Sequence, residues 1–377
     1  MSAYLKKGKK DVWQIEIFLG LKSNGKKNCH YETYHGSKKG ADARDAQLKA
    51  ELKDGTFIIN NGLTFEKFSE KWMKEYARQT LAPKTIAEYD RLLSIINPKI
   101  GHYKLMNIKP LVLVEFYNAM RNRPGKKKLS ETSILRYYAL INAIFNKAVK
   151  WDLIRVNPNE KLDKPKREKH EARYYDVDQT KSLLDALESE NIRNRTLIRL
   201  AIDTGARRGE LTGLEWEDIN FKNNSININK VTQAGRGIGV IEKKPKNDSS
   251  IRRVFMTDHT AQLLQELKKH QKMLEKEFGS QWKGSKKIFT STDGNRIHPD
   301  RPSQILKEII RKNNLADLPF HGLRHTSVSL LIAAGVHTQV ISKRVGHSSS
   351  ATTRDIYSHV FETSEKEAVG KLDTILN

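Results

Sequence analysis

The first sixty residues carry an alternation of apolar and polar side chains that predicts β-strands. Over residues 11–34 every second residue of the first half is apolar, and residues 23–25, Ser-Asn-Gly, are typical of a tight turn. The apolar face of this alternation comprises Trp13, Ile15 and Ile17. A helix is expected over 41–52, ended by Gly55. Residues 1–60 are therefore predicted to form a small sheet with one helix.

From residue 64 to residue 150 the apolar residues recur at intervals of three and four, which predicts helices. The first such series is Phe65, Phe68, Trp72 and Tyr76, and the last is Ile134, Tyr138, Ile141, Ile144 and Phe145. We expect four or five helices in a second domain, residues 61–158. Residues 159–172 hold many charges and few apolar side chains, which indicates an exposed basic linker and a domain boundary.

In residues 173–377 the spacing of the apolar residues changes twice. Helical spacing over 180–188 and 196–204 gives way to a strand-rich stretch at 225–255, and helical spacing then returns. No internal repeat is visible. The chain is therefore predicted to be α+β and predominantly α, with a third, mainly helical domain at residues 173–377 that includes a C-terminal tail. The apolar residues after residue 359 predict that this tail packs on a neighbouring protomer or on its own site.

The charge of the chain points to a polyanionic partner. The 377 residues contain 68 Lys and Arg against 44 Asp and Glu, a net charge of +24, and about +12 of it lies in residues 61–170. Nucleic acid is the first partner to consider, because phosphates are what such a surface neutralises. The predicted DNA-binding residues are Arg121, Arg123, Lys126, Lys127, Lys128, Lys164, Lys166 and Arg167.

Other classes of protein fit the composition poorly. Cys29 is the single cysteine, which excludes a disulfide framework, a cysteine-rich zinc module and an iron–sulfur cluster. No apolar run approaches the roughly 20 residues needed to span a bilayer, so a cytoplasmic protein without a membrane partner is predicted. His321 and His325 have the spacing of two zinc ligands, but Gly322 stands where a zinc hydrolase has its glutamate, so no metal is expected.

The last third of the chain contains the residue types that phosphodiester chemistry requires. Two permanently charged guanidiniums, Arg207 and Arg324, can bind the non-bridging oxygens of a phosphate under attack. Tyr357 can attack phosphorus and form a phosphotyrosine that preserves the bond energy for rejoining. A lysine such as Lys246 can protonate the departing oxygen.

The order and spacing of these residues closely resemble the tyrosine recombinase family, in particular phage and integrative-element integrases. The matching segments are Thr-Gly-Ala-Arg-Arg-Gly-Glu-Leu at 204–211, His-Gly-Leu-Arg-His at 321–325, Gly-His at 346–347, and Tyr357. The resemblance implies the catalytic residues Arg207, Lys246, His321, Arg324, His347 and Tyr357, with Glu210 supporting the site. Lys243 and Lys244 lie beside Lys246 and remain alternatives for the general acid.

The resemblance also implies a fold and an activity. Residues 1–60 are similar to an arm-type DNA-binding domain and residues 61–158 to a core-binding domain. The implied enzyme cleaves and rejoins DNA through a 3′-phosphotyrosyl intermediate, without a cofactor, to integrate or excise a mobile element or prophage. The implied partners are double-stranded attachment-site DNA, three further copies in a tetramer, an excisionase and a host DNA-bending protein, at the nucleoid of a bacterial cell.

Two other functions remain open at this point. A non-catalytic, sequence-specific DNA-binding protein would share the charge, and a topoisomerase-like enzyme that cuts and reseals one duplex would share the nucleophile. The second would have no need of an arm-binding sheet.

Overall fold

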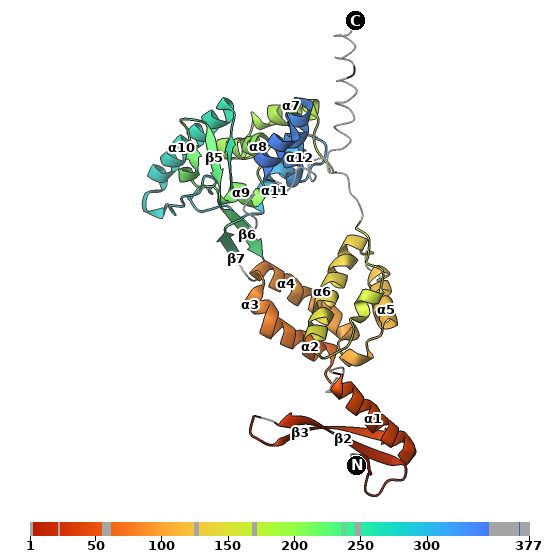
Figure 1. Cartoon of the computed structure of the whole chain (residues 1–377). Coiled ribbons are helices and arrows are strands. Elements are labelled where there is room, and N and C mark those ends of the chain that lie inside the picture. The colour runs from red at the N-terminus through yellow and green to blue at the C-terminus, as the bar shows by residue number, and fades with distance from the viewer. Residues whose placement is uncertain are drawn as a thin grey trace. The chain divides into compact units, whose positions relative to one another are not determined.

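The chain divides into two compact units in the computed structural model, Met1–Glu168 and Lys169–Asn377 (Figure 1). The structure describes residues 3–21, 23–54, 62–123, 128–167, 172–235, 237, 239–245, 250–346 and 369. The division between the units falls inside the stretch predicted as a linker, residues 159–172.

The N-terminal module is an antiparallel three-stranded sheet with one helix packed on it. Its elements are β1 Ala3–Leu5, β2 Val12–Leu21, β3 Lys27–His35 and α1 Lys38–Lys53, and the strand order is β1-β2-β3. Ile15 and Ile17 of β2 are buried against Ala41 and Leu48 of α1, as the alternation predicted. The helix begins three residues before the predicted residue 41 because the Ser37 hydroxyl accepts a hydrogen bond from the amide of Gly40 and caps it.

The rest of the first unit is helical. Its elements are α2 Phe65–Trp72, the π-helical turn η1 Met73–Ala77, α3 Arg78–Thr80, α4 Pro83–Ile100, η2 Leu105–Asn107, α5 Pro110–Arg121, α6 Glu131–Lys150 and η3 Pro158–Lys161. One core joins them, with Phe65, Phe68, Trp72 and Phe145 almost completely buried. The apolar series read from the sequence therefore marks the inward faces of α2 and α6.

The second unit is a mainly helical body with a small sheet and a separate hairpin. Its elements are α7 Val177–Leu187, α8 Ile192–Thr204, α9 Arg208–Gly213, η4 Trp216–Asp218, β4 Ile219–Asn220, β5 Ser225–Ile228, β6 Val231–Gly235, β7 Gly239–Lys243, β8 Arg252–Phe255, α10 Asp258–Phe278, η6 Gly279–Gln281, α11 Arg301–Lys312, α12 Phe320–Ala333 and α13 Thr338–Val345. The sheet order is β4-β5-β8. Among the described strands β6 and β7 pair only with each other, and they project from the body of the unit (Figure 1). The predicted fold class, α+β and predominantly α, is confirmed.

The turn between α8 and α9 requires its glycine. Gly205 ends α8 with a φ angle of +60°, a left-handed backbone conformation that residues other than glycine rarely adopt. A Cβ at this position would lie 2.9 Å from Cγ1 of Val345, so α13 packs directly on this turn. The turn thus brings the end of α13 next to the start of α9.

The described helices contain no candidate for a membrane span: none combines the length and the apolar character that crossing a bilayer needs.

Candidate active site

Arg207 lies at the N-terminus of α9, where its backbone and side chain are both held by Glu210. The backbone amide of Arg207 donates to Oε2 of Glu210 at 2.9 Å, and Nη1 pairs with Oε1 at 2.9 Å. Nη2 of Arg207 also donates to the carbonyl of Gly346 at 3.3 Å. The guanidinium is therefore oriented by contacts on α9 and at the end of α13, while part of it stays open to solvent.

Glu210 is shared between two arginines. Its side chain is 1% exposed, and Oε2 also accepts a hydrogen bond from Nη2 of Arg252 at 2.9 Å. Burial raises the pKa of Glu210, but the Arg252 and Arg207 guanidiniums outweigh burial and hold that pKa below its ordinary value. Glu210 is therefore charged at neutral pH and fixes Arg207 as an ion pair.

Arg252 connects three elements of the site. Its side chain is 4% exposed, and besides Glu210 it donates from Nε to the carbonyl of Arg344 at 2.7 Å. Arg344 in turn donates to the backbone carbonyl of Asp203 at 2.8 Å. Because Asp203 lies near the end of α8, these bonds join β8, α13 and α8 around Arg207.

Arg324 lies on α12 and reaches the same turn from the other side. The residue is buried, and its Nη1 donates to the carbonyl of Gly205 at 2.9 Å. Gly205 is two residues before Arg207, so the two guanidiniums predicted to bind phosphate oxygens converge on one turn. A charged group buried at this depth requires such partners.

His321 lies one turn before Arg324 on α12 and stays neutral at neutral pH. Surrounding atoms desolvate the imidazole, and the positive charges of Arg324 and Arg207 act in the same direction, so the pKa of His321 is lowered. The neighbouring ring of His325 lies edge-on, with centroids 4.8 Å apart and the planes at 86°. A neutral imidazole can accept a proton, which is what activation of a nucleophile requires.

Lowering the pH from 7 to 5 is expected to destabilise α12. Desolvation, the charge that His321 carries when it is protonated, and the positive charge of Arg324 lower the pKa of His325 to about 4, whereas an imidazole in the unfolded chain titrates near pH 6.5. Between these values the unfolded state binds more protons, so stability is full above about pH 6.5 and is lost as the pH falls toward 4. The loss at pH 5 is at most about 2 kcal/mol, because solvent screening of the partly exposed imidazole reduces it.

Hydrogen–deuterium exchange of the α12 amides, corrected for the intrinsic effect of pH, measures this loss. His325→Gln should lose less protection than the wild type over the same pH range. An identical pH dependence in the two proteins would contradict the assignment.

Three predicted catalytic residues, Lys246, His347 and Tyr357, lie outside the described residues, as does the C-terminal tail except Val369. Gly346, whose carbonyl accepts the bond from Arg207, directly precedes His347 in the chain. The alternatives to Lys246 are described: Lys243 is the last residue of β7 and is paired with Val231, and Lys244 follows it. The structure therefore brings together Arg207, Glu210, His321 and Arg324 of the predicted set.

The predicted DNA-binding residues differ in their availability. Lys128, Lys164, Lys166 and Arg167 are exposed, and Lys126 and Lys127 lie outside the described residues. Arg121 is already paired with Glu131, Nε to Oε1 at 2.6 Å, and Arg123 is partly buried. Among the described members of this set, the exposed positive charge is therefore concentrated in residues 164–167.

Sequence reasoning assigned no role to Arg252, Arg344 or Asp203. One feature of the sequence could have indicated a role for Arg252: it is two residues before Val254, so in a strand the two side chains lie on the same face. In β8 both are buried, whereas Arg253 and Phe255 are exposed. An arginine at an inward position of a strand needs an acidic partner. The sequence around Asp203 and Arg344 gives no such signal. These two residues lie on different helices far apart in the chain, so the spacing within either helix does not indicate that they pair.

Comparison with known proteins adds to this geometry. The model of the phage integrase family matches residues 173–364, and that of the phage integrase N-terminal SAM-like domain matches residues 64–121. A XerC-like tyrosine recombinase of Caldanaerobacter subterraneus is 26% identical, over 99% of this chain and 98% of its own. The ICEBs1 integrase of Bacillus subtilis is 24% identical, over 99% of this chain and 100% of its own.

Solved structures share the fold. The Tn1549 transposon integrase in complex with a circular intermediate DNA superposes with a TM-score of 0.66 at 21% identity, covering 82% of this chain and 99% of that one. A lambda integrase dimer bound to a COC′ core site gives a TM-score of 0.59 at 18% identity, covering 94% of this chain and 95% of that one.

Proposed function

This chain belongs to the phage integrase family, tyrosine recombinases that cleave and rejoin DNA, and from that premise we propose that it integrates and excises a mobile element or prophage at specific sites. The observation that carries the proposal is that Arg324 is bonded to Gly205, in the turn that leads into Arg207, and that both positive charges act on the neutral His321. Two fixed guanidiniums next to a proton acceptor suit a phosphodiester under nucleophilic attack.

In the proposed first step, the phenolic oxygen of Tyr357 attacks the scissile phosphorus. The bond from phosphorus to the 5′-oxygen breaks, and a 3′-phosphotyrosyl bond forms. His321 takes or positions the proton of the phenol, and Lys246 gives a proton to the departing 5′-oxygen. Arg207 and Arg324 bind the non-bridging oxygens where negative charge accumulates, and His347 bonds one of these oxygens.

In the second step the free 5′-hydroxyl of a partner duplex attacks the phosphotyrosine. The new phosphodiester forms as the bond to Tyr357 breaks, so the number of phosphate bonds is unchanged and no energy source is needed. Two such rounds exchange both strands through a four-way junction. We infer a homotetramer on two duplexes, in keeping with the lambda integrase tetramer that was solved bound to a Holliday junction.

The other domains are proposed to hold the DNA. Residues 1–60 would bind arm-type sites and residues 61–158 the core site, with the exposed Lys164, Lys166 and Arg167 along the phosphate backbone. An excisionase and a host DNA-bending protein are proposed as further partners. Action on chromosomal attachment sites would place the protein at the nucleoid of its bacterial host.

The test of this function is an SDS-resistant adduct between the protein and supercoiled DNA carrying the ends of the host element. The adduct should form in the presence of EDTA, because the arginines and not a metal ion neutralise the phosphate. Sequencing the trapped DNA locates the cleavage site. Loss of the adduct on chelation, restored by Mg²⁺, would contradict the proposed chemistry.

A further inference from the structure

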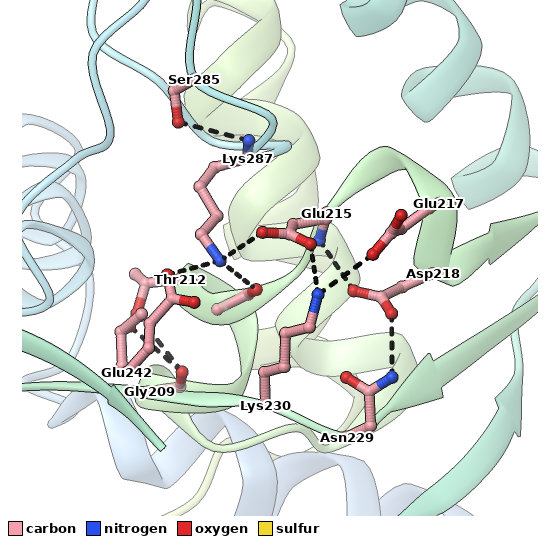
Figure 2. Close-up of polar contacts among 12 residues, drawn as sticks. Gly209, Thr212, Glu215, Glu217, Asp218, Asn229, Lys230, Glu242, Ser285 and Lys287 are labelled. Atoms are coloured by element: carbon pink, nitrogen blue, oxygen red, sulfur yellow. Dashed lines mark hydrogen bonds and ion pairs between the residues drawn. The ribbon is translucent and has the colours of Figure 1, made fainter. Parts of the chain in front are cut away.

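A cluster of charged side chains lies where the hairpin β6–β7 joins the body of the second unit (Figure 2). At its centre is Lys287, whose side chain is only 6% exposed. Its ammonium nitrogen lies 2.6 Å from Oε1 of Glu242, 2.9 Å from Oε1 of Glu215 and 3.0 Å from the carbonyl oxygen of Gly213. The three protons of the ammonium group thus have three acceptors.

Because every proton of the Lys287 ammonium group has an acceptor, this cluster connects the hairpin rigidly to the body of the unit. Burying an ammonium group is costly unless its charge is paired and each proton is accepted. Glu215 is held in place by a second lysine, Lys230, which also contacts Oε1 of Glu217 at 3.1 Å. Burial raises the pKa of Glu215, but the bonds from Lys230 and Lys287 outweigh it and lower that pKa to about 2. The acceptor is therefore ionised throughout the physiological range.

The cluster joins the hairpin to the helix that carries the catalytic arginine. Gly213 is the last residue of α9, which begins directly after Arg207, whereas Glu242 lies on β7. The same helix also touches β6 closely: a Cβ on Gly209 would lie 2.6 Å from the carbonyl oxygen of Thr232. The hydroxyls of Thr212 and Thr232 are hydrogen-bonded as well. The hairpin β6–β7 thus packs against α9.

The two attachments to α9 bracket the segment that contains Lys246. Glu242 precedes Lys246 by four residues and is bound through Lys287 to the end of α9. Arg252 follows Lys246 by six residues and is bound to Glu210 on the same helix. Glu242 and Arg252, on either side of this segment, are therefore both attached to α9, the helix that also sets the position of Arg207.

We propose that Glu242, acting through Lys287, is a positioning residue. It fixes the end of β7, four residues before Lys246, and thereby favours proton transfer to the departing 5′-oxygen. This inference rests on the proposed function, in which Lys246 is the general acid. A general acid must lie within hydrogen-bonding distance of the leaving oxygen, and a displacement of about 1 Å can cost about a hundredfold in rate.

Glu242→Ala removes the ion pair between β7 and Lys287 but leaves the other contacts of Lys287 in place. The Glu242 side chain is 35% exposed, and Lys287 keeps Glu215 and the carbonyl of Gly213 after its removal. Glu217→Ala is the matched control. Glu217 belongs to the same cluster and is 68% exposed, but its ion pair is with Lys230 and not with β7.

The experiment compares two substrates that differ in one atom. The rate of adduct formation is measured with a normal scissile phosphodiester and with a 5′-bridging phosphorothiolate, in which sulfur replaces the departing oxygen. A thiol has a pKa near 8.5, far below that of an alcohol, so a thiolate leaves without being protonated. A defect that acts through the general acid disappears on the sulfur substrate, whereas a general structural defect persists.

Glu242→Ala is expected to slow cleavage of the phosphodiester by about 30-fold and to match the wild type on the phosphorothiolate. Glu242→Gln, which retains an acceptor for Lys287, should fall between the two, and Glu217→Ala should match the wild type on both substrates. Equal losses on both substrates, or no loss on the phosphodiester, would overturn the role of Glu242.

Lys246→Ala separates this inference from the proposed function. It should lose more activity than Glu242→Ala on the phosphodiester and regain it on the phosphorothiolate. If Lys246→Ala is not restored by sulfur, Lys246 is not the general acid, and that part of the proposed function fails together with the inference. If Lys246→Ala is restored and Glu242→Ala is not, the inference alone fails.

Discussion

Tyr357→Phe is expected to bind attachment-site DNA nearly as tightly as the wild type and to form no covalent adduct with it. The substitution removes one hydroxyl from an interface in which phosphate contacts by Lys and Arg dominate the affinity. The same hydroxyl supplies the oxygen that bonds to phosphorus, and phenylalanine has no atom that can replace it. The expected loss of adduct is therefore complete.

A gel-shift titration and an SDS-resistant adduct assay on the same DNA measure the two effects. Residues 173–377 contain only two other tyrosines, and Tyr175→Phe is the control, because its phenol donates to the carbonyl of Ala316 instead. Tyr175→Phe should form the adduct. Formation of an adduct by Tyr357→Phe, or a collapse of DNA binding, would remove Tyr357 from the role of nucleophile.

Arg324→Ala is expected to slow cleavage by about a thousandfold, which corresponds to about 4 kcal/mol of transition-state stabilisation. Arg324 is buried and fixed to the carbonyl of Gly205, so its charge is held in place before the phosphate arrives. Charge that is already oriented in a poorly solvated site stabilises a transition state more strongly than charge on a mobile side chain. Arg324→Lys keeps the charge but not the paired donors, and should recover only part of the rate.

Because Arg324 is buried, its removal also creates a cavity, and the measurement must separate catalysis from folding. A methylphosphonate at the scissile position is uncharged and needs less neutralisation, so the ratio of wild-type to variant rates should shrink on this substrate. Thermal unfolding of the variant shows how much of it is folded at the assay temperature. An undiminished ratio on the methylphosphonate would assign Arg324 a structural role only.

The chemistry of the site was predictable from the sequence because each motif is local. The glycine, arginine and glutamate of residues 205–210 lie within two turns, so their spacing on the chain already fixes their spacing in space. The histidine and arginine of α12 are likewise one helical turn apart. The apolar series of α2 and α6 and the alternation in β2 predicted the cores for the same reason, since burial follows the period of the element.

The sequence by itself determined the fold class, the basic character and the residue types of the phosphate site. The tertiary structure decided how those residues are held: Glu210 between Arg207 and Arg252, and Lys287 between Glu215 and Glu242. Apart from Arg207 and Glu210, which are three residues apart, these pairs join residues that are distant in the chain. A buried charge leaves no periodic pattern in the sequence around it. Its partner is chosen by the way helices and strands pack, because only packing removes the water that would otherwise satisfy it.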